Sequence, residues 1–292
     1  MRRAAAWRAW PPEPPPMSLE TEVTALMCEV ATTVVMPRFR MLAAHEIAEK
    51  SPGEIVTSVD LEAERRLHDG LAALGLCARI VGEEAVAQAP ALLDDVGEGL
   101  VWLIDPLDGT ANFAAGQRPF GMMVALVDDG VPIAGWLLDP SSGRMFFAER
   151  GKGATCEGIK VRPPAPARPP LRAALGTHFM RPRRRARVHA RAEQRFTVVP
   201  VPRCAAESYP RLVLGQDDIA LFQRILPWDH AAGALLLTEI GGRVTHWDGS
   251  PYRVGSGRTG VLAATGERLW QEAANLLLVP ETGLPEMEAL TT

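Results

Sequence analysis

The sequence predicts a mixed α/β fold, because helical and strand patterns alternate along its 292 residues. Apolar residues recur three and four positions apart after Ser18, which is typical of an amphipathic helix. Short apolar runs such as VWLI end at turn residues and indicate buried strands. From Phe120 onward, apolar runs alternate with tight turns, which predicts an antiparallel meander.

Residues 18–50 are predicted to form one long helix that packs on a sheet and ends at a Pro-Gly pair. Asp60 can cap the next helix, and a short strand then ends at Gly82 with two glutamates at its tip. In the second half, helices are predicted for the arginine-rich stretch, for PWDHAAGALLLTE and for the segment after Glu267, with strands between them.

A proline-rich segment divides the chain into two predicted domains. Residues 162–170 hold five prolines, which neither a helix nor a sheet accommodates, and are predicted to form a linker. An N-terminal α+β metal-binding domain is expected over residues 17–161 and a C-terminal α/β domain over residues 171–280. Residues 1–16 and 281–292 are predicted to be tails.

Residues 1–16 have two interpretations. Their proline run favours a solvated polyproline arm, and no apolar segment of a secretory signal follows their paired arginines. Met17 is an alternative start, so whether residues 1–16 are translated is left open.

Composition excludes several classes of protein. Hydrophobic residues make up 47% and charged residues 23% of the chain, which argues against wholesale disorder, and the apolar runs are too short to span a bilayer. A net charge of -4 argues against coating nucleic acid through global charge. The four cysteines form no CxxC pair, which indicates reduced thiols and a cytoplasmic protein.

Acidic residues gather where predicted strands end. Asp105 and Asp108 follow the apolar run VWLI, and Glu83 and Glu84 follow the strand that ends at Gly82. Carboxylates held together on rigid strand ends repel one another unless a cation lies between them, and few lysines or arginines are close in sequence. Hard oxygen ligands in this number suit Mg²⁺ together with a substrate phosphate.

Two helix starts extend this pattern. If a helix begins at Gly109 and Thr110, its free N–H groups form an anion site beside the metals. Asp229 is expected at the start of another helix, where it is either a third acidic ligand or an ordinary N-cap. Metal-assisted phosphoryl transfer is the chemistry that carboxylates, metal and phosphate would support together.

Several motifs resemble those of the inositol monophosphatase family of Mg²⁺-dependent, lithium-sensitive phosphatases. VGEE, IDPLDGTANF and PWDHAAG occur in the family's order, and EIVTSVDLEAE and ERGKGATCEG resemble further motifs. The resemblance runs from about Met17 to Leu278. It implies a layered αβαβα sandwich of the sugar-phosphatase type, in which helix pairs alternate with two β-sheets, and it implies a homodimer.

The resemblance also implies a set of metal ligands. Glu83, Asp105 and the backbone carbonyl of Leu107 would bind a first Mg²⁺. Asp105, Asp108 and Asp229 would bind a second, and a third, weaker Mg²⁺ would lie near Glu83. Two or three Mg²⁺ ions per active site are therefore expected.

Catalytic and substrate contacts are implied in the same way. Thr110, with Glu83, would orient the water that attacks phosphorus, and the amides of Gly109 and Thr110 would hold phosphate oxygens beside Asp108. Asp60 matches an aspartate behind the third metal, and its alternative role is to cap its own helix. Asp60, Glu83 and Thr110 are therefore the expected catalytic residues.

Substrate choice is the part that the resemblance supports least. Phe222 stands where the animal enzymes have a glutamate that contacts the inositol ring. Arg203 and Glu207 are candidate contacts for a polar ligand, with a structural salt bridge as the alternative. The arginine run over residues 181–191 is either a solvated helix face or a site for a distal phosphate or RNA.

Three functions follow from these observations. The first is a Mg²⁺-dependent phosphomonoesterase that hydrolyses a small phosphorylated metabolite, a polyol or sugar phosphate similar to inositol 1-phosphate. The second is a 3'(2'),5'-bisphosphate nucleotidase or a histidinol-phosphate phosphatase, which share the metal motifs. The third is a regulatory protein that binds RNA or the transcription machinery, which the arginine run favours.

Overall fold

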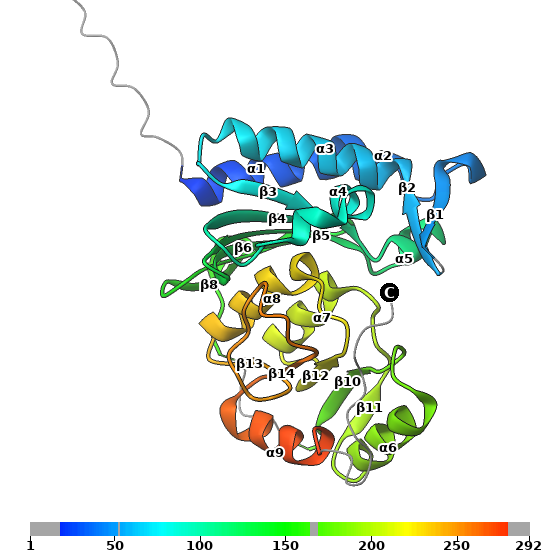
Figure 1. Ribbon diagram of the computed structural model, residues 1–292, viewed down its shortest axis with the longest axis vertical. Coiled ribbons are helices and arrows are strands. Elements are labelled where there is room, and N and C mark those ends of the chain that lie inside the picture. The colour runs from blue at the N-terminus through cyan, green and yellow to red at the C-terminus, as the bar shows by residue number, and fades with distance from the viewer. Residues whose placement is uncertain (1–17, 52, 164–168, 280–292) are drawn as a thin grey trace, which may run out of the picture.

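Five layers of helices and sheets form the protein, and they alternate in the order αβαβα (Figure 1). The computed structural model describes residues 18–51, 53–163 and 169–279. The predicted tails, residues 1–16 and 281–292, lie outside these ranges, as does most of the predicted proline-rich linker. The layered mixed α/β fold that the resemblance implied is confirmed.

The first layer consists of helices from the N-terminal part of the chain. Ser18 caps the first helix by accepting a hydrogen bond from the backbone N–H of Thr21. The layer comprises α1 (Leu19–Val30), a π-helical turn (Ala31–Val35), α2 (Met36–Arg38) and α3 (Ser58–Ala73). Between α2 and α3 lie a 3₁₀ turn (Ala44–Glu46) and a hairpin of β1 (Ile47–Ser51) and β2 (Glu54–Thr57).

The predicted helix over residues 18–50 was therefore too long. It ends at Arg38, after which Phe39 is extended and Arg40 has a φ of 65°, in the left-handed region. The apolar spacing continues through Phe39 and Leu42, which pack against the same core although they lie beyond the helix, so the pattern alone does not mark the helix end. Residues 47–57 form a hairpin instead, and Gly53 lies in its turn with a φ of 80°.

The second layer is a seven-stranded sheet in which the strands follow the chain order. β3 and β4 are parallel and all later neighbours are antiparallel, which confirms the predicted meander. The strands are β3 (Arg79–Gly82), β4 (Leu100–Asp108), β5 (Gly121–Asp128), β6 (Val131–Asp139), β7 (Arg144–Glu149), β8 (Gly153–Cys156) and β9 (Ile159–Lys160). Three short helical elements lie between them: α4 (Glu83–Gln88), a 3₁₀ turn (Pro90–Leu93) and α5 (Thr110–Ala114).

The remaining layers come from the second half of the chain. α7 (Ala205–Val213) and α8 (Pro227–Glu239) lie between the sheets, and α6 (Pro182–Ala192) and α9 (Glu267–Leu277) cover the far side (Figure 1). The five-stranded sheet has the order β11-β10-β12-β14-β13. Its strands are β10 (Arg172–Gly176), β11 (Thr197–Val199), β12 (Ile219–Phe222), β13 (Arg243–His246) and β14 (Val261–Ala264).

Both faces of each sheet are buried, so the layers share three hydrophobic cores. On β4, Trp102 and Ile104 pack toward the first helix layer, whereas Val101 and Leu103 pack toward the middle helices. A third core joins the five-stranded sheet to α6 and α9. The middle core contains residues from both halves of the chain, so α7 and α8 complete the burial of the first sheet.

No helix in the described part of the chain is long and apolar enough to cross a membrane.

Candidate active site

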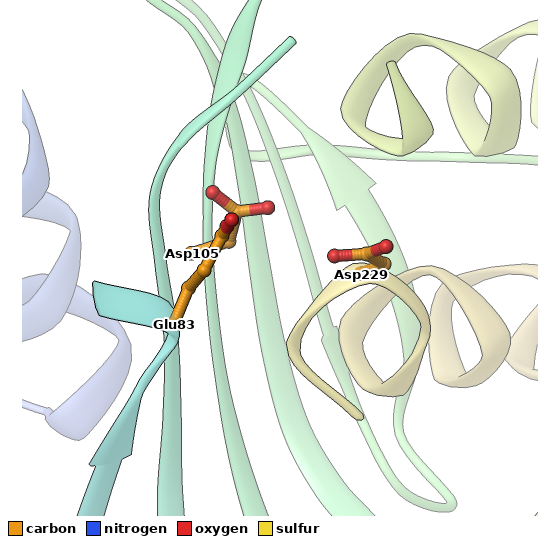
Figure 2. A group of neighbouring side chains, drawn as sticks. All are labelled: Glu83, Asp105 and Asp229. Carbon is orange, nitrogen blue, oxygen red and sulfur yellow. The ribbon is translucent and has the colours of Figure 1, made fainter. Parts of the chain in front are cut away.

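Two acidic side chains meet where β3 and β4 end. In the parallel pairing of these strands, Gly82 lies opposite Ile104, so the next residues, Glu83 and Asp105, are neighbours. Glu83 is the first residue of α4, and Asp105 belongs to β4 and is only 1% exposed. Figure 2 shows that both carboxylates point to the same place.

Asp229 approaches the same place from the start of α8 (Figure 2). The helix lies close to the first sheet because Gly135 on β6 has no side chain: a Cβ there would come within 2.8 Å of the Ala232 backbone. Carboxylate oxygens of Glu83, Asp105 and Asp229 all lie within 4.8 Å of one another. Three of the four acidic side chains that the sequence analysis gave as metal ligands therefore converge on one point.

Asp108 lies beside this cluster and is held by the middle helices. Its Oδ2 accepts a hydrogen bond of 2.6 Å from the backbone N–H of Ala206, in the first turn of α7. Asp105 and Asp108 are separated by an irregularity in the pairing of β4 with β5. Asp108 therefore ties the end of the first sheet to α7 while it lines the cavity with Asp105.

Two residues that the sequence analysis did not select position Glu83. Glu64 of α3 accepts hydrogen bonds of 2.8 Å from the backbone N–H groups of Glu84 and Ala85, which caps α4. Lys50 of β1 donates hydrogen bonds to the carboxylates of Glu83 and Glu84. The two glutamates therefore have a basic partner, and it comes from a distant part of the sequence.

Neither residue carries a local signal that points to this role. Lys50 is 33 residues from Glu83 and reaches it only through the hairpin that was predicted as helix. Glu64 lies within the motif EIVTSVDLEAE, which was the one available pointer to it. Glu84, in the first turn of the same helix as Glu83, is buried and does not line the cavity.

Asp60 takes part in capping its own helix, which is one of the two roles that the sequence analysis left open. It is the third residue of a capping box in which Thr57 is the N-cap of α3. Its other oxygen, Oδ1, lies 2.9 Å from the hydroxyl of Thr110. The same hydroxyl lies 3.0 Å from the Leu107 carbonyl, so Asp60 and Leu107, rather than Glu83, are the hydrogen-bond acceptors next to Thr110.

Burial makes the acids of this site hard to ionise. It is the main cause of the raised pKa of Asp105, with the charges of Glu83 and Asp108 adding to it. Burial and the charge of Glu83 raise the pKa of Asp229 in the same way. Burial also raises the pKa of Asp108 to about 6. Burial is therefore the first obstacle to ionising these acids, and the negative charge of Glu83 is a further one.

The acids around them are affected similarly. Burial raises the pKa of Asp60 to about 6. Burial and the charge of Glu83 raise the pKa of Glu84 to about 7, although Lys50 opposes the shift. Burial alone would lower the pKa of Lys50, but its contacts with the two glutamates outweigh this and raise it above its usual value.

A divalent cation fits this set of donors. All the converging groups are carboxylate oxygens, which hard cations such as Mg²⁺ prefer. The negative charges of neighbouring acids add to the effect of burial in raising the pKa values of Asp105 and Asp229, and a cation would offset these charges. The backbone carbonyl of Leu107 lies next to Thr110, on the same strand end, so it is also available.

A cavity of about 380 Å³ opens in front of the acids. Gly109, with a φ of 83°, precedes α5, so the helix start predicted at Gly109 and Thr110 is present. Both residues line the cavity, as does Arg203. Glu207 is not among the lining residues and lies 3.9 Å from Arg144, which agrees with the salt-bridge alternative.

The opposite wall belongs to the five-stranded sheet. Phe222, at the end of β12, lines the cavity where the resemblance led us to look for a ring-binding glutamate. The arginine run forms the predicted helix, α6, on which Arg183, Arg185 and Arg187 are exposed, and Arg181 is its exposed N-cap.

Comparison with protein families gives one match that covers most of the chain. Residues 19–279 match the model of the inositol monophosphatase family. The inositol-1-monophosphatase of Bacillus subtilis is 30% identical over 207 residues, which are 70% of this chain and 77% of that protein. The Nus factor SuhB of Pseudomonas aeruginosa is 32% identical over 70% of this chain and 76% of its own length.

Solved structures show the same fold. A structure of the Thermotoga maritima IMPase superposes with a TM-score of 0.75 and 25% identity, and it covers 89% of this chain and 97% of its own chain. The motifs, the converging acids and the family match agree with one another. The chain therefore belongs to the inositol monophosphatase family and is a phosphoric monoester hydrolase.

Proposed function

We propose that the chain is a Mg²⁺-dependent phosphomonoesterase that hydrolyses a small polyol or sugar phosphate, with inositol 1-phosphate as one candidate. The observation that carries this proposal is the convergence of Glu83, Asp105 and Asp229 within 4.8 Å at the edge of an open cavity. Two or three Mg²⁺ ions per site and sensitivity to lithium belong to the same proposal.

Each acid has a defined part in it. Glu83, Asp105 and the Leu107 carbonyl would hold one metal, and Asp105, Asp108 and Asp229 a second. Metal ions in such a site activate water, neutralise phosphate charge and stabilise the leaving oxygen. Their ligands come from β4, α4 and α8, whose positions are set by the buried cores rather than by loops.

Residues next to the acids would handle the proton and the phosphate. The Thr110 hydroxyl lies between Asp60 and the Leu107 carbonyl, so it is oriented before substrate arrives. With Asp60 or Glu83 as acceptor, it would align the attacking water and take part in removing its proton. The N–H groups of Gly109 and Thr110 would hold phosphate oxygens beside Asp108.

Phosphate release from a panel of substrates tests this function. The panel contains inositol 1-phosphate, a sugar phosphate, histidinol phosphate and 3'-phosphoadenosine 5'-phosphate, each with and without Mg²⁺. Release that requires Mg²⁺ and falls in the presence of Li⁺ is expected for at least one substrate. No release from any of them would contradict the proposal, and equal release without metal would contradict the assigned ligands.

A second candidate is a regulatory role in transcription, alone or beside catalysis. Two relatives carry the name Nus factor SuhB, and the arginines of α6 offer a basic surface. Capture of RNA polymerase from a lysate by the wild-type chain, but not by a variant with the arginines of α6 changed to alanine, would support it. A variant that binds as well as the wild type would exclude α6 as the contact.

We also propose that the protein is a homodimer, because members of the family usually are. A cytoplasmic location is proposed from the cysteine content. Sedimentation at micromolar concentration distinguishes a dimer from a monomer.

A further inference from the structure

The outer end of the cavity is formed by two segments from different halves of the chain. On one side lies the hairpin of β1 and β2, from which Gly53, Glu54 and Ile55 line the cavity. On the other side, Phe179 follows β10 and Arg224 follows β12, and both line the cavity as well. Gly53, Phe179 and Arg224 are exposed, so this is the end of the cavity that meets solvent.

An ion pair joins the two segments. Glu54 and Arg224 are 170 residues apart in sequence, and the guanidinium of Arg224 donates a hydrogen bond to Oε1 of Glu54. Their side chains are 34% and 42% exposed, which places the pair at the boundary between the cavity and solvent. We call Glu54, Arg224 and Phe179 the outer rim.

Arg224 is held in place by its neighbours. Its guanidinium lies over the ring of Phe179, with Cζ 4.9 Å from the ring centroid. Its carbonyl lies 3.2 Å from Nε2 of His230, and since a carbonyl can only accept, Nε2 carries the proton. Nδ1 of the same ring then accepts a hydrogen bond of 2.9 Å from the Tyr209 hydroxyl. His230 therefore ties the backbone of Arg224 to α8 and, through Tyr209, to α7.

Glu54 is held from the hairpin side. The hydroxyl of Ser51 donates a hydrogen bond of 2.9 Å to Oε2 of Glu54, which leaves Oε1 for Arg224. Lys50 anchors the same hairpin through its bonds to the two glutamates of α4. An isolated surface ion pair contributes little, but the partners of this pair are both positioned before substrate arrives.

The outer rim limits the space for a substrate. A cavity of about 380 Å³ is small for a ligand site, since such sites measure about 300–1,000 Å³. With the phosphate at the acids, the leaving group would lie between them and the outer rim. A short leaving group would leave the Glu54–Arg224 pair intact, whereas a longer one has to displace it.

We propose that the outer rim determines specificity by limiting the length of the leaving group, with the Glu54–Arg224 pair as the contact that a longer group has to break. The proposal rests on the phosphatase function proposed above and adds a specificity determinant to it. Selection of this kind acts by excluding long phosphomonoesters rather than by binding short ones. Loss of the pair should therefore admit longer substrates.

A matched pair of substrates tests the proposal. Phenyl phosphate and biphenyl-4-yl phosphate have the same scissile bond and differ in the length of the leaving group. The measured quantity is the ratio of kcat/KM for the long substrate to that for the short one. We expect a ratio of about 0.1 or less for the wild type, and a rise of about five- to tenfold in Glu54→Gln, mainly through a lower KM for the long substrate.

A double-mutant cycle shows whether the two residues act as a pair. Arg224→Gln, which keeps the carbonyl bonded to His230, should raise the ratio about as much as Glu54→Gln. The double variant should raise it no further, because either substitution already breaks the pair. Thermal melts confirm that each variant is folded.

Glu272→Gln is the matched control. Glu272 pairs with Arg195, and the side chains are 36% and 43% exposed, which is close to the exposure of the rim pair. Neither residue lines the cavity, so this variant should leave the ratio unchanged.

Three results would overturn the proposal: an unchanged ratio in Glu54→Gln and Arg224→Gln, an equal change in Glu272→Gln, or effects that multiply in the double variant. Calorimetric binding of phenylphosphonate and biphenyl-4-ylphosphonate in the presence of Mg²⁺ separates these results from failure of the phosphatase function, because phosphonates have no ester bond to hydrolyse. A preference for the shorter phosphonate that weakens in Glu54→Gln supports the outer rim even if no phosphate is released. Equal affinity of the wild type for both contradicts it.

Discussion

At the scale of single residues, the site combines buried acids with too little positive charge. Asp105 is 1% exposed and adjoins two other acids, and its pKa is raised mainly by burial. Lys50 compensates part of the charge, because it donates hydrogen bonds to Glu83 and Glu84. Such an arrangement costs folding free energy unless a cation completes it, so ligand function and stability oppose each other here.

Asp105→Asn should abolish activity while making the metal-free protein more stable. A metal ligand is lost, so kcat/KM should fall about a thousand-fold, or about 4 kcal/mol of transition-state stabilisation. The amide removes a buried charge, so the metal-free melting temperature should rise by about 3 °C. Phosphate release and thermal melts in chelator measure the two effects. An active variant would refute the metal assignment.

Lys50→Met should have the opposite effect on stability. It leaves Glu83 and Glu84 without their cation, so the metal-free protein should lose about 1–2 kcal/mol. Lys152→Met is the control, because Lys152 pairs with Glu149 at the surface, where its side chain is 70% exposed and the pair contributes little. Denaturant melts compare the two, and Mg²⁺ should reduce the deficit of the Lys50 variant. An equal loss of stability in the two variants would show that the buried Lys50 contacts contribute no more than a surface ion pair.

At the scale of elements, the position of α8 relative to β6 sets the site. The helix carries Asp229 in its first turn, and it lies close to the first sheet only because Gly135 has no side chain. Gly233 makes a similar contact inside α8, since a Cβ there would meet the ring of Tyr209. Two glycines with no catalytic chemistry therefore decide how near Asp229 comes to Asp105.

Gly135→Ser should displace α8 and damage the site. The new Cβ would lie 2.8 Å from the Ala232 backbone, so the helix must move and stability should fall by about 1–3 kcal/mol. Activity per folded molecule should fall as well, since Asp229 moves with the helix. Gly266→Ser is the matched control, because nothing lies within 4 Å of a Cβ there and serine suits that N-cap. Full activity in the Gly135 variant would contradict this account of the packing.

At the scale of the whole molecule, metal binding and folding are linked through pH. Asp108 and Asp60 have pKa values of about 6 in the folded protein, above their usual values near 4. The folded state therefore keeps protons that the unfolded state has already released. Stability from these groups is full below about pH 4 and is lost as the pH rises toward 6, and Glu84 extends the window to about 7.

The melting temperature should therefore respond to Mg²⁺ in a pH-dependent way. Bound metal favours the ionised acids, so it should stabilise the protein more at about pH 7.5 than at about pH 5, by about 5 °C or more. Melts in chelator and in excess Mg²⁺ across this range measure the difference. In the Asp105→Asn variant, the stabilisation by Mg²⁺ should depend less on pH. A stabilisation that is the same at every pH would contradict the role of these acids.

Local patterns were enough to predict the fold class and the convergence of the acids. The strand end at Gly82 and the helix start before Asp229 are each marked by apolar runs and turn residues and lie where expected, whereas β4 continues past Asp105 to Asp108. Their roles as ligands stay predictions. The family resemblance added the order of the layers, which periodicity alone does not specify.

Contacts between distant segments were not predicted. The hairpin that carries Lys50 was taken for helix because its short strands lack a clear apolar alternation. The hydrogen bond between the Thr110 hydroxyl and Asp60 was not predicted either, because it depends on where the first turn of α3 lies relative to β4. Both depend on how layers stack, which a single sequence does not show in its local pattern.

The shared middle core has a consequence for synthesis of the protein on the ribosome. The seven-stranded sheet is complete at Lys160, but α7 and α8, which cover one of its faces, end only at Glu239. At usual elongation rates this face waits roughly 4 to 16 s for its cover. During that interval apolar strands such as β4 and β5 stay uncovered on one face, so we expect the nascent chain to need protection against aggregation.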